Sequence, residues 1–279
     1  MNRLKEGLAA LLCLAALAAS LSGCSARTTS IDCVIGVSLA NLREQWRLVL
    51  KDELEAEAKK YEGVRLVMTD AAGDSEKQAE DVERLMSYGI DLLIISPSDV
   101  EALTPVIGGA YEEIPVIVMD RAVEGYNYSL FIGPDNDLIG RQAGKTVLEL
   151  LGERGIPNAS VLELKNDSFA SESRSVEFVK TVSEAQVTTR SIDLSEATRD
   201  CAEDTLLAEP EVLKDIDVIF AHNDYMAYGA HLALEKLNIQ GIQIVGLDGF
   251  SGESGGLQLV GQGLIDATVT CPTGGTEAI

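Results

Sequence analysis

The side chains best able to take part in chemistry are Asp, Asn and Arg residues that follow short apolar runs. They comprise Asn41, Trp46 and Arg47, then Asp70, the segment 97–99, Asp120 and Arg121, Asn166, Asp167 and Arg174, the segment 222–224, and Asp248. Sugar hydroxyls both donate and accept hydrogen bonds, so a polyol requires carboxylate or amide acceptors beside guanidinium donors. An indole ring can also cover the apolar C–H face of a sugar ring. These residue types therefore favour the binding of a neutral polyol.

Each of these residues also has an ordinary structural alternative. An aspartate just after a strand often caps the next helix or forms an Asx turn. The aspartates to which this alternative applies are Asp70, Asp99, Asp224 and Asp248. For Trp46 the alternative is packing in the apolar stripe of its helix. Because Trp46 is the only tryptophan and an arginine follows it directly, we favour ligand contact for this residue.

The sequence lacks the motifs that usually support catalysis. It contains no GxGxxG after a strand, no GxxxxGK[ST] and no HExxH. The string Gly-Glu-Ser-Gly-Gly at 252–256 has the composition of a turn and not of a GxSxG nucleophile elbow. The two histidines, His222 and His231, lie nine residues apart, which is the wrong spacing for a metal pair on one helix. We therefore expect neither an enzyme nor a metal or cofactor site. An aldose-modifying enzyme that uses only paired aspartates is the remaining catalytic alternative.

The composition is that of a globular, strongly acidic protein. The 279 residues include 46% hydrophobic and 24% charged residues, which fits one or two folded domains. Lys and Arg number 22 against 45 Asp and Glu, for a net charge of −23. A phosphate-binding surface needs clustered basic residues, so nucleic acid is excluded as an expected partner.

The amino terminus has the features of an export signal. Arg3 and Lys5 precede an apolar run over 8–19 that is too short to span a bilayer as a stable helix. The tetrad Leu-Ser-Gly-Cys at 21–24 follows, and it resembles the lipobox of bacterial lipoproteins, whose cysteine is lipidated. An ordinary cleaved signal, with the cysteine incidental, is the alternative.

We therefore expect residues 1–24 to be a lipoprotein signal, with Cys24 lipidated and 25–30 forming a tether. The chain is then predicted to lie outside the cytoplasm, anchored to the cell membrane through the lipid. The remaining cysteines, Cys33, Cys201 and Cys271, indicate no disulfide framework and no metal site, because their number is odd and their spacing wide.

Alternating strands and helices must position the polar residues. Strands are predicted at 33–38, 64–69, 92–96 and 116–119, with helices at 44–61, 75–88 and 103–112. After 131–136, helices are predicted at 138–151, 171–184, 200–208 and 225–237, and strands at 160–164, 187–194, 218–221, 244–247 and 267–270. Short apolar runs without alternation are typical of parallel sheets covered on both faces. The sequence therefore predicts two doubly wound α/β lobes, with ligands at the carboxyl ends of their strands.

Five motifs in order carry a family resemblance. They are Asp-Arg at 120–121, Gly-Pro-Asp-Asn at 133–136, Ala-His-Asn-Asp at 221–224 with Met-Ala at 226–227, Gly-Leu-Asp-Gly at 246–249, and Asp-Ala-Thr at 266–268. With these motifs the chain resembles the periplasmic sugar-binding proteins of ABC importers, of the ribose and galactofuranose types. The resemblance implies two lobes joined by a hinge of three crossovers, with sugar clamped between them when the hinge closes. It places the lobes at 31–134 and 135–271, with 272–279 returning to the first lobe.

The resemblance also assigns roles to individual residues. Asp120 and Arg121 match the family's sugar-binding pair, Arg174 its second-lobe arginine, Asn223 the Asn of its Asn-Asp pair, and Asp248 the Asp of its Gly-x-Asp-Gly turn. The first loop, 41–47, is more similar to that of the galactofuranose binders, whose Trp-Arg pair contacts the ligand. The expected ligand-binding residues are therefore Trp46, Arg47, Asp70, Asp120, Arg121, Arg174, Asn223 and Asp248.

Departures from the ribose pattern leave the ligand open. The second-lobe aromatic expected near 197–198 is missing, and Cys271 stands where ribose binders place a Gln. Three arginines near one cleft also permit an acidic sugar. The implied partner is an ABC permease that reads the closed form of a monomeric receptor. A ligand-sensing lipoprotein that partners a membrane sensor kinase or chemoreceptor is the alternative.

The carboxyl terminus, 273–279, has the pattern of the opening turn of a helix. In the resembling family a helix at this point returns to the first lobe and a closing strand follows. We therefore expect a C-terminally truncated product, and the alternative is a natural short variant.

Overall fold

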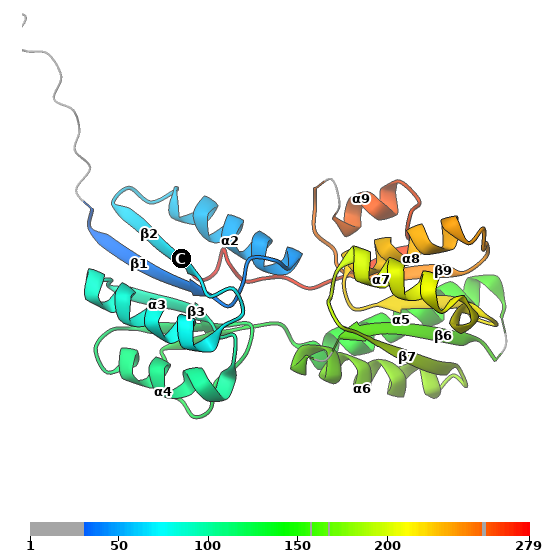
Figure 1. The fold of residues 1–279 in the computed structure, drawn as a ribbon, viewed down its shortest axis with the longest axis horizontal. Coiled ribbons are helices and arrows are strands. Elements are labelled where there is room, and N and C mark those ends of the chain that lie inside the picture. The colour runs from blue at the N-terminus through cyan, green and yellow to red at the C-terminus, as the bar shows by residue number, and fades with distance from the viewer. Residues whose placement is uncertain (1–30, 157, 167, 253–254) are drawn as a thin grey trace, which may run out of the picture.

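The computed structural model describes residues 31–279 apart from 157, 167 and 253–254. It contains two α/β lobes, each built on a five-stranded parallel sheet, which confirms the predicted fold class (Figure 1). The expected signal at 1–24, its Cys24 and the tether at 25–30 lie outside the described residues. None of the described helices combines the length and the apolar composition needed to cross a membrane.

The first sheet has the strand order β2-β1-β3-β4-β5. Its elements in chain order are β1 (Cys33–Leu39), α2 (Gln45–Ala58), β2 (Val64–Asp70), α3 (Ser75–Tyr88), β3 (Leu92–Ser96), α4 (Val100–Tyr111), β4 (Val116–Met119) and β5 (Leu130–Ile132). Helices α3 and α4 pack on one face and α2 on the other. All neighbouring strands are parallel, so their carboxyl ends share one edge of the sheet.

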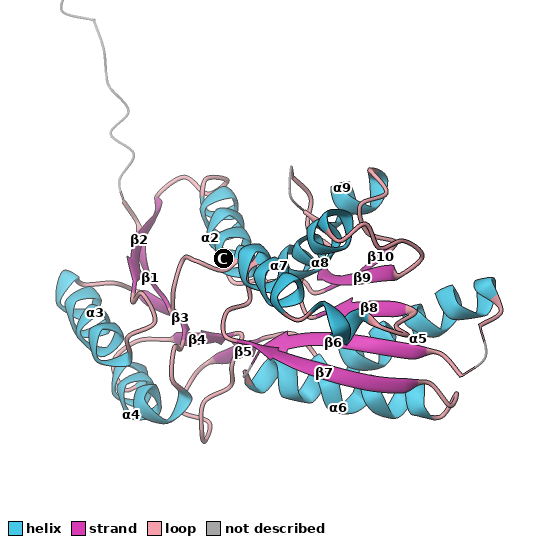
Figure 2. Cartoon of the chain, turned by 45° about the vertical axis from the view of Figure 1, so that its right-hand side comes forward, coloured by secondary structure: helices cyan, strands magenta, loops and turns pink. Residues whose placement is uncertain are grey.

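The second sheet has the order β10-β9-β8-β6-β7. Its elements are α5 (Asn136–Arg154), β6 (Ser160–Asn166), α6 (Phe169–Ser183), β7 (Thr188–Leu194), α7 (Arg199–Ala208), the 3₁₀ helix η1 (Pro210–Leu213), β8 (Val218–Ala221), α8 (Asp224–Lys236), β9 (Gln243–Asp248), α9 (Gly256–Gly261) and β10 (Ala267–Thr270). Helices α5 and α6 cover one face and α7 and α8 the other, as Figure 2 shows.

Burial explains why these runs form central strands. Every residue of β8 is buried, and so is all of β3 except its first residue. Helices cover both faces of such strands, so both sets of side chains are removed from water. Six of the described helices begin with a side chain that accepts a hydrogen bond from the first turn, and these caps are Asp74, Asp99, Asp135, Ser168, Thr198 and Asn223. Asp99 thus has the capping role that was its structural alternative.

The chain crosses between the lobes from β5 to α5 and returns after β10 (Figure 1). The described residues therefore include two of the three crossovers that the resemblance implies. After the return, Ala278 packs in the first-lobe core with Leu50 and Leu54 of α2. The hydroxyl of Thr273 also donates a hydrogen bond to Glu53 on the same helix.

Strand β5, helix α9 and helix η1 were not predicted. Strand β5 is three residues long at the edge of the sheet, and Leu130 is exposed, so it lacks a buried apolar run. Helix α9 begins in a glycine-rich stretch that has the composition of a turn. A Cβ atom on Gly256 would collide with the carboxyl group of Asp224, so this glycine permits close packing.

Candidate ligand-binding site between the lobes

A polar cleft lies between the two lobes at the carboxyl ends of both sheets. Its lining residues are Glu44, Gln45, Trp46, Arg47, Asp120 and Arg121 from the first lobe, and Asn166, Ser168, Ala170, Ser171, Arg174, Ala197, His222, Asn223, Met226 and Asp248 from the second. The cleft encloses about 690 Å³ of space, open solvent included. The structure thus brings together seven of the eight residues expected to bind ligand.

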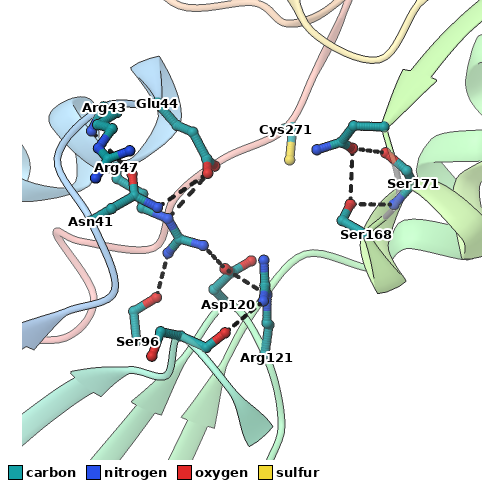
Figure 3. A network of polar contacts seen from close by, with 12 residues as sticks. Asn41, Arg43, Glu44, Arg47, Ser96, Asp120, Arg121, Ser168, Ser171 and Cys271 are labelled. Atoms are coloured by element: carbon teal, nitrogen blue, oxygen red, sulfur yellow. Dashed lines mark hydrogen bonds and ion pairs between the residues drawn. The ribbon is translucent and has the colours of Figure 1, made fainter. Parts of the chain in front are cut away.

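Arg47 is the most buried charged residue of the first-lobe wall, with 2% of its surface exposed. Its Nη1 donates to Ser96 Oγ at 2.6 Å and its Nη2 to Asp120 Oδ2 at 3.0 Å (Figure 3). Its Nε lies 3.6 Å from Glu44 Oε2. Because the guanidinium is occupied by protein partners, Arg47 holds Asp120 in place at the cleft wall.

Asp120 and Arg121 form the exposed part of the same wall. Asp120 follows β4 with φ of +70°, a left-handed conformation that an aspartate seldom adopts. Arg121 Nη1 donates to Ser98 O at 3.2 Å, and its Nε lies 3.7 Å from Asp120 Oδ2. The Arg121 side chain keeps 28% of its surface exposed. This arginine therefore presents donors to the cleft beside the Asp120 carboxylate.

Trp46 lies between the lobes. It packs against the apolar core of the first lobe and also against the second-lobe core that includes Cys271. The Arg47 guanidinium carbon lies 6.0 Å from the indole centre, at the outer limit of a cation–π contact. The indole therefore combines the packing role that was its alternative with a place in the cleft lining.

Arg174 gathers three separate parts of the chain at the second-lobe wall. From α6, its Nε donates to Asn136 Oδ1 at 2.8 Å, its Nη1 to His222 O at 3.5 Å and its Nη2 to Cys271 Sγ at 3.5 Å. Burial raises the pKa of the Cys271 thiol to about 12, although Arg174 acts in the opposite direction. The thiol is therefore protonated at neutral pH.

Asp248 and Asp224 lie close together at the end of β9. Burial raises the pKa of Asp248 well above its ordinary value, Arg174 opposes that shift, and Asp224 adds to it. Burial also raises the pKa of Asp224 to about 6, against hydrogen bonds from Thr268 Oγ1 at 2.6 Å and Gly249 N at 2.8 Å. Asp224 therefore secures the loop after β9, whereas Asp248 faces the cleft.

Asn223 and Asp70 have structural hydrogen bonds of their own. Asn223 caps α8 by accepting from Met226 N at 2.7 Å and donates to Ala197 O at 2.9 Å, while it still lines the cleft.

Asp70 Oδ1 accepts from Ala72 N at 2.8 Å in the turn after β2. Asp70 is not among the lining residues, because β2 is the edge strand farthest from β4 and β5. The structure thus gives Asp70 the turn-forming role that was its alternative.

Several residues near the cleft were not predicted from the sequence. Glu44, Ser168 and Ser171 line it, and Glu163 lies buried behind it. The signal for Glu163 is a single carboxylate inside the apolar strand at 160–164. Within the described ranges, no three His, Cys, Asp or Glu side chains are grouped so as to hold a metal ion.

Two parallel-sheet lobes around a polar cleft are the architecture of type I periplasmic binding proteins. Residues 35–276 match the family model described as a periplasmic binding protein domain. The chain belongs to this family, which confirms the resemblance drawn from its motifs.

Similar proteins bind several different sugars. The ribose import binding protein of Bacillus subtilis (strain 168) is 31% identical over 245 residues, which cover 84% of this chain and 75% of the relative. The galactofuranose-binding protein of Escherichia coli (strain K12) is 27% identical, with 74% and 67% covered. Among solved structures, the fructose-binding periplasmic domain of a hybrid two-component system aligns with a TM-score of 0.76 and 33% identity, covering 88% of this chain and 82% of that one.

Proposed function

We propose that this protein is an extracytoplasmic solute-binding protein that captures a monosaccharide or a similar polyol between its lobes. The observation that carries the proposal is the meeting of Arg121 and Asp120 from one lobe with Arg174 and Asp248 from the other in one cleft. Adjacent donors and acceptors on two facing walls match a ligand whose hydroxyls do both. The sugars bound by the similar proteins support the same class of ligand.

The two walls have different tasks in this mechanism. The first-lobe wall is preassembled, because the buried Arg47 fixes Asp120 before any ligand arrives. The second-lobe wall carries Arg174, which Asn136 ties to the crossover into α5. Hinge closure brings the walls onto the ligand and excludes water from its hydroxyls. The ligand leaves chemically unchanged, so the protein acts as a receptor and not as an enzyme.

The proposal includes a membrane anchor and a transport partner. Lipidation of Cys24 would hold a monomer at the outer face of the cytoplasmic membrane or in the periplasm. An ABC permease would then recognise the closed form and import the sugar. The ribose import binding proteins among the relatives support this assignment.

A sensor role is the second candidate. One structural neighbour is a fructose-binding periplasmic domain of a hybrid two-component system, so the same lobes also serve signalling. Cross-linking in cells followed by identification of the captured membrane protein separates the two roles. A permease supports import, and a sensor kinase or chemoreceptor supports sensing.

Isothermal calorimetry with D-ribose, D-fructose, L-arabinose, D-galactose and myo-inositol tests the ligand class. We expect saturable heat from at least one neutral polyol, with the compound recovered unchanged after incubation. The absence of binding to every polyol would overturn the sugar assignment, and a chemically altered compound would overturn the receptor assignment.

A further inference from the structure

The Glu163 carboxylate lies behind the second-lobe wall, in the middle of β6, and is 0% exposed. Among the described residues, neither Lys nor Arg forms an ion pair with it. It accepts instead from the hydroxyls of Ser175 on α6 and Ser191 on β7, both to Oε2, at 2.9 and 2.6 Å. The ring of His222 completes the set, with Nε2 2.9 Å from Oε1. One carboxylate therefore joins three elements of the lobe.

The protonation states of Glu163 and His222 follow from their surroundings. Burial raises the pKa of Glu163, but hydrogen bonds from His222 and the two serines outweigh burial and leave it lowered. Burial lowers the pKa of His222, and the attraction of Glu163 only partly opposes that shift. At neutral pH a charged carboxylate thus accepts a hydrogen bond from the Nε2–H of a neutral ring. Nδ1 of His222 then carries a lone pair and has no hydrogen-bond partner among the described residues.

The partners of Glu163 are direct neighbours of residues that line the cleft. Ser175 follows Arg174 on α6, and His222 precedes Asn223 at the start of α8. The backbone oxygen of His222 also accepts from Arg174 Nη1 at 3.5 Å. The Phe220 ring packs against the imidazole, with 4.9 Å between the two ring centres. Any shift of the Glu163 carboxylate is therefore transmitted to Arg174 and Asn223 together.

We propose that Glu163 and His222 are a positioning pair, which fixes Arg174 and Asn223 relative to each other for ligand binding without contacting the ligand. This inference rests on the proposed function of the cleft. A purely structural pair would affect stability alone, whereas a positioning pair affects affinity at constant fold.

Paired substitutions at His222 provide the sharpest test. The amide nitrogen of glutamine can occupy the place of Nε2, while that of asparagine reaches only the place of Nδ1. We expect His222→Gln to bind within about three-fold of wild type, because the hydrogen bond to Glu163 is kept. His222→Asn and Glu163→Gln should each weaken binding by at least about ten-fold, since a hydrogen bond to a charged group is lost.

Glu203→Gln is the matched control in the same lobe. Glu203 on α7 is largely buried and pairs with Lys236 on α8, away from the cleft. Its substitution should lower the melting temperature and leave affinity unchanged. The titrant is the tightest binder among D-ribose, D-fructose, L-arabinose, D-galactose and myo-inositol, measured by calorimetry on variants that melt cooperatively.

The pH dependence of sugar affinity distinguishes a positioning role from a purely structural one. The charged groups that act on the ring are Glu163 and Lys165 on β6 and Arg174 on α6, while the neighbouring β8 residue, Phe220, is apolar. Protonation of His222 adds a cation near Arg174 and creates a buried N–H without an acceptor. Affinity for a neutral sugar should therefore fall in acid, below the ordinary imidazole pKa. His222→Gln should make that fall smaller than in wild type, because Asp248 in the cleft lining still titrates.

Exchange of the Arg174 Nε–H with solvent, followed by NMR in the unliganded protein, tests the pair without any sugar. Glu163→Gln and His222→Asn should speed this exchange, and Glu203→Gln should not. Unchanged exchange in the first two variants, or unchanged affinity where a sugar binds, would overturn the positioning pair. If no sugar binds to wild type, the proposed function fails while the exchange rates still decide this inference.

Discussion

Arg47 shows that a charged side chain can line a cleft while both of its terminal nitrogen atoms already donate to protein partners. Ser96, Asp120 and Glu44 surround its guanidinium, and almost none of it is exposed. Arg121, one residue beyond Asp120, keeps more of its surface open to the cleft. The two arginines should therefore respond differently to substitution.

Arg121→Ala should abolish sugar binding and leave the protein cooperatively folded. The side chain makes one hydrogen bond to a backbone oxygen and is partly exposed, so its removal should cost less than about 1 kcal/mol of stability. Calorimetry and thermal melting measure the two effects. Arg141→Ala, which removes an ion pair with Glu177 outside the cleft, should leave affinity intact. Equal loss of affinity in both variants would remove Arg121 from the site.

Arg47→Lys should act mainly on stability. An ammonium group cannot span Ser96 and Asp120 as the guanidinium fork does, so we expect a loss of about 1–3 kcal/mol in the free energy of unfolding. Urea unfolding measures this loss. Arg43→Lys is the control, because Arg43 is exposed and its side chain donates to the backbone oxygen of Ala72. A loss at Arg47 no greater than at Arg43 would contradict the supporting role.

At the scale of elements, the second-lobe wall depends on how closely α8, α9 and the end of β9 approach one another. Asp224 at the start of α8 accepts from Gly249 N and Thr268 Oγ1, and Gly256 of α9 lies directly against its carboxyl group. The Asp224 carboxyl group thus contacts α9, β10 and the turn after β9, and it leaves no room for an added methyl group on Gly256.

Gly256→Ala should destabilise the protein by about 1–3 kcal/mol, because the new Cβ atom collides with the Asp224 carboxyl group. Gly261→Ala, in the same helix, places its Cβ in open space and should be neutral or slightly stabilising. Chemical denaturation of both variants measures the difference. Equal stability of the two variants would contradict the close packing.

Asp224 should make stability fall as pH rises from about 4 to 6. Its pKa is raised from 3.8 to about 6, so between these values the folded state holds a proton that the unfolded state has lost. The shift corresponds to about 3 kcal/mol. His222 acts in the opposite direction, since its lowered pKa makes stability rise with pH up to the ordinary imidazole value.

The contribution of Asp224 is therefore measured as a difference between variants. The unfolding free energy of wild type relative to that of Asp224→Asn should fall as pH rises from about 4 to 6, because only wild type loses a proton from the folded state over that range. Parallel pH profiles in the two proteins would show that the carboxyl group titrates normally.

At the scale of the whole molecule, the two lobes were predictable because central parallel strands are uninterrupted apolar runs. The edge strand β5 was not, since it is short and partly exposed. The cleft residues were predictable as a set, because parallel strands deliver their following residues to one edge. Their partners were not, because Arg174 contacts Asn136 and Cys271 at sequence separations of 38 and 97 residues. Nothing local in the sequence encodes such pairings.

The central claim is that a neutral polyol binds between the lobes, and the fluorescence of Trp46 tests it most directly. Trp46 is the only tryptophan in the chain, it lines the cleft and it packs against both lobes. Titration with the tightest-binding sugar should change its emission saturably, with the same midpoint as the calorimetric heat, and Arg121→Ala should remove the change. Saturable heat with unchanged Trp46 emission would place the ligand elsewhere and contradict the claim.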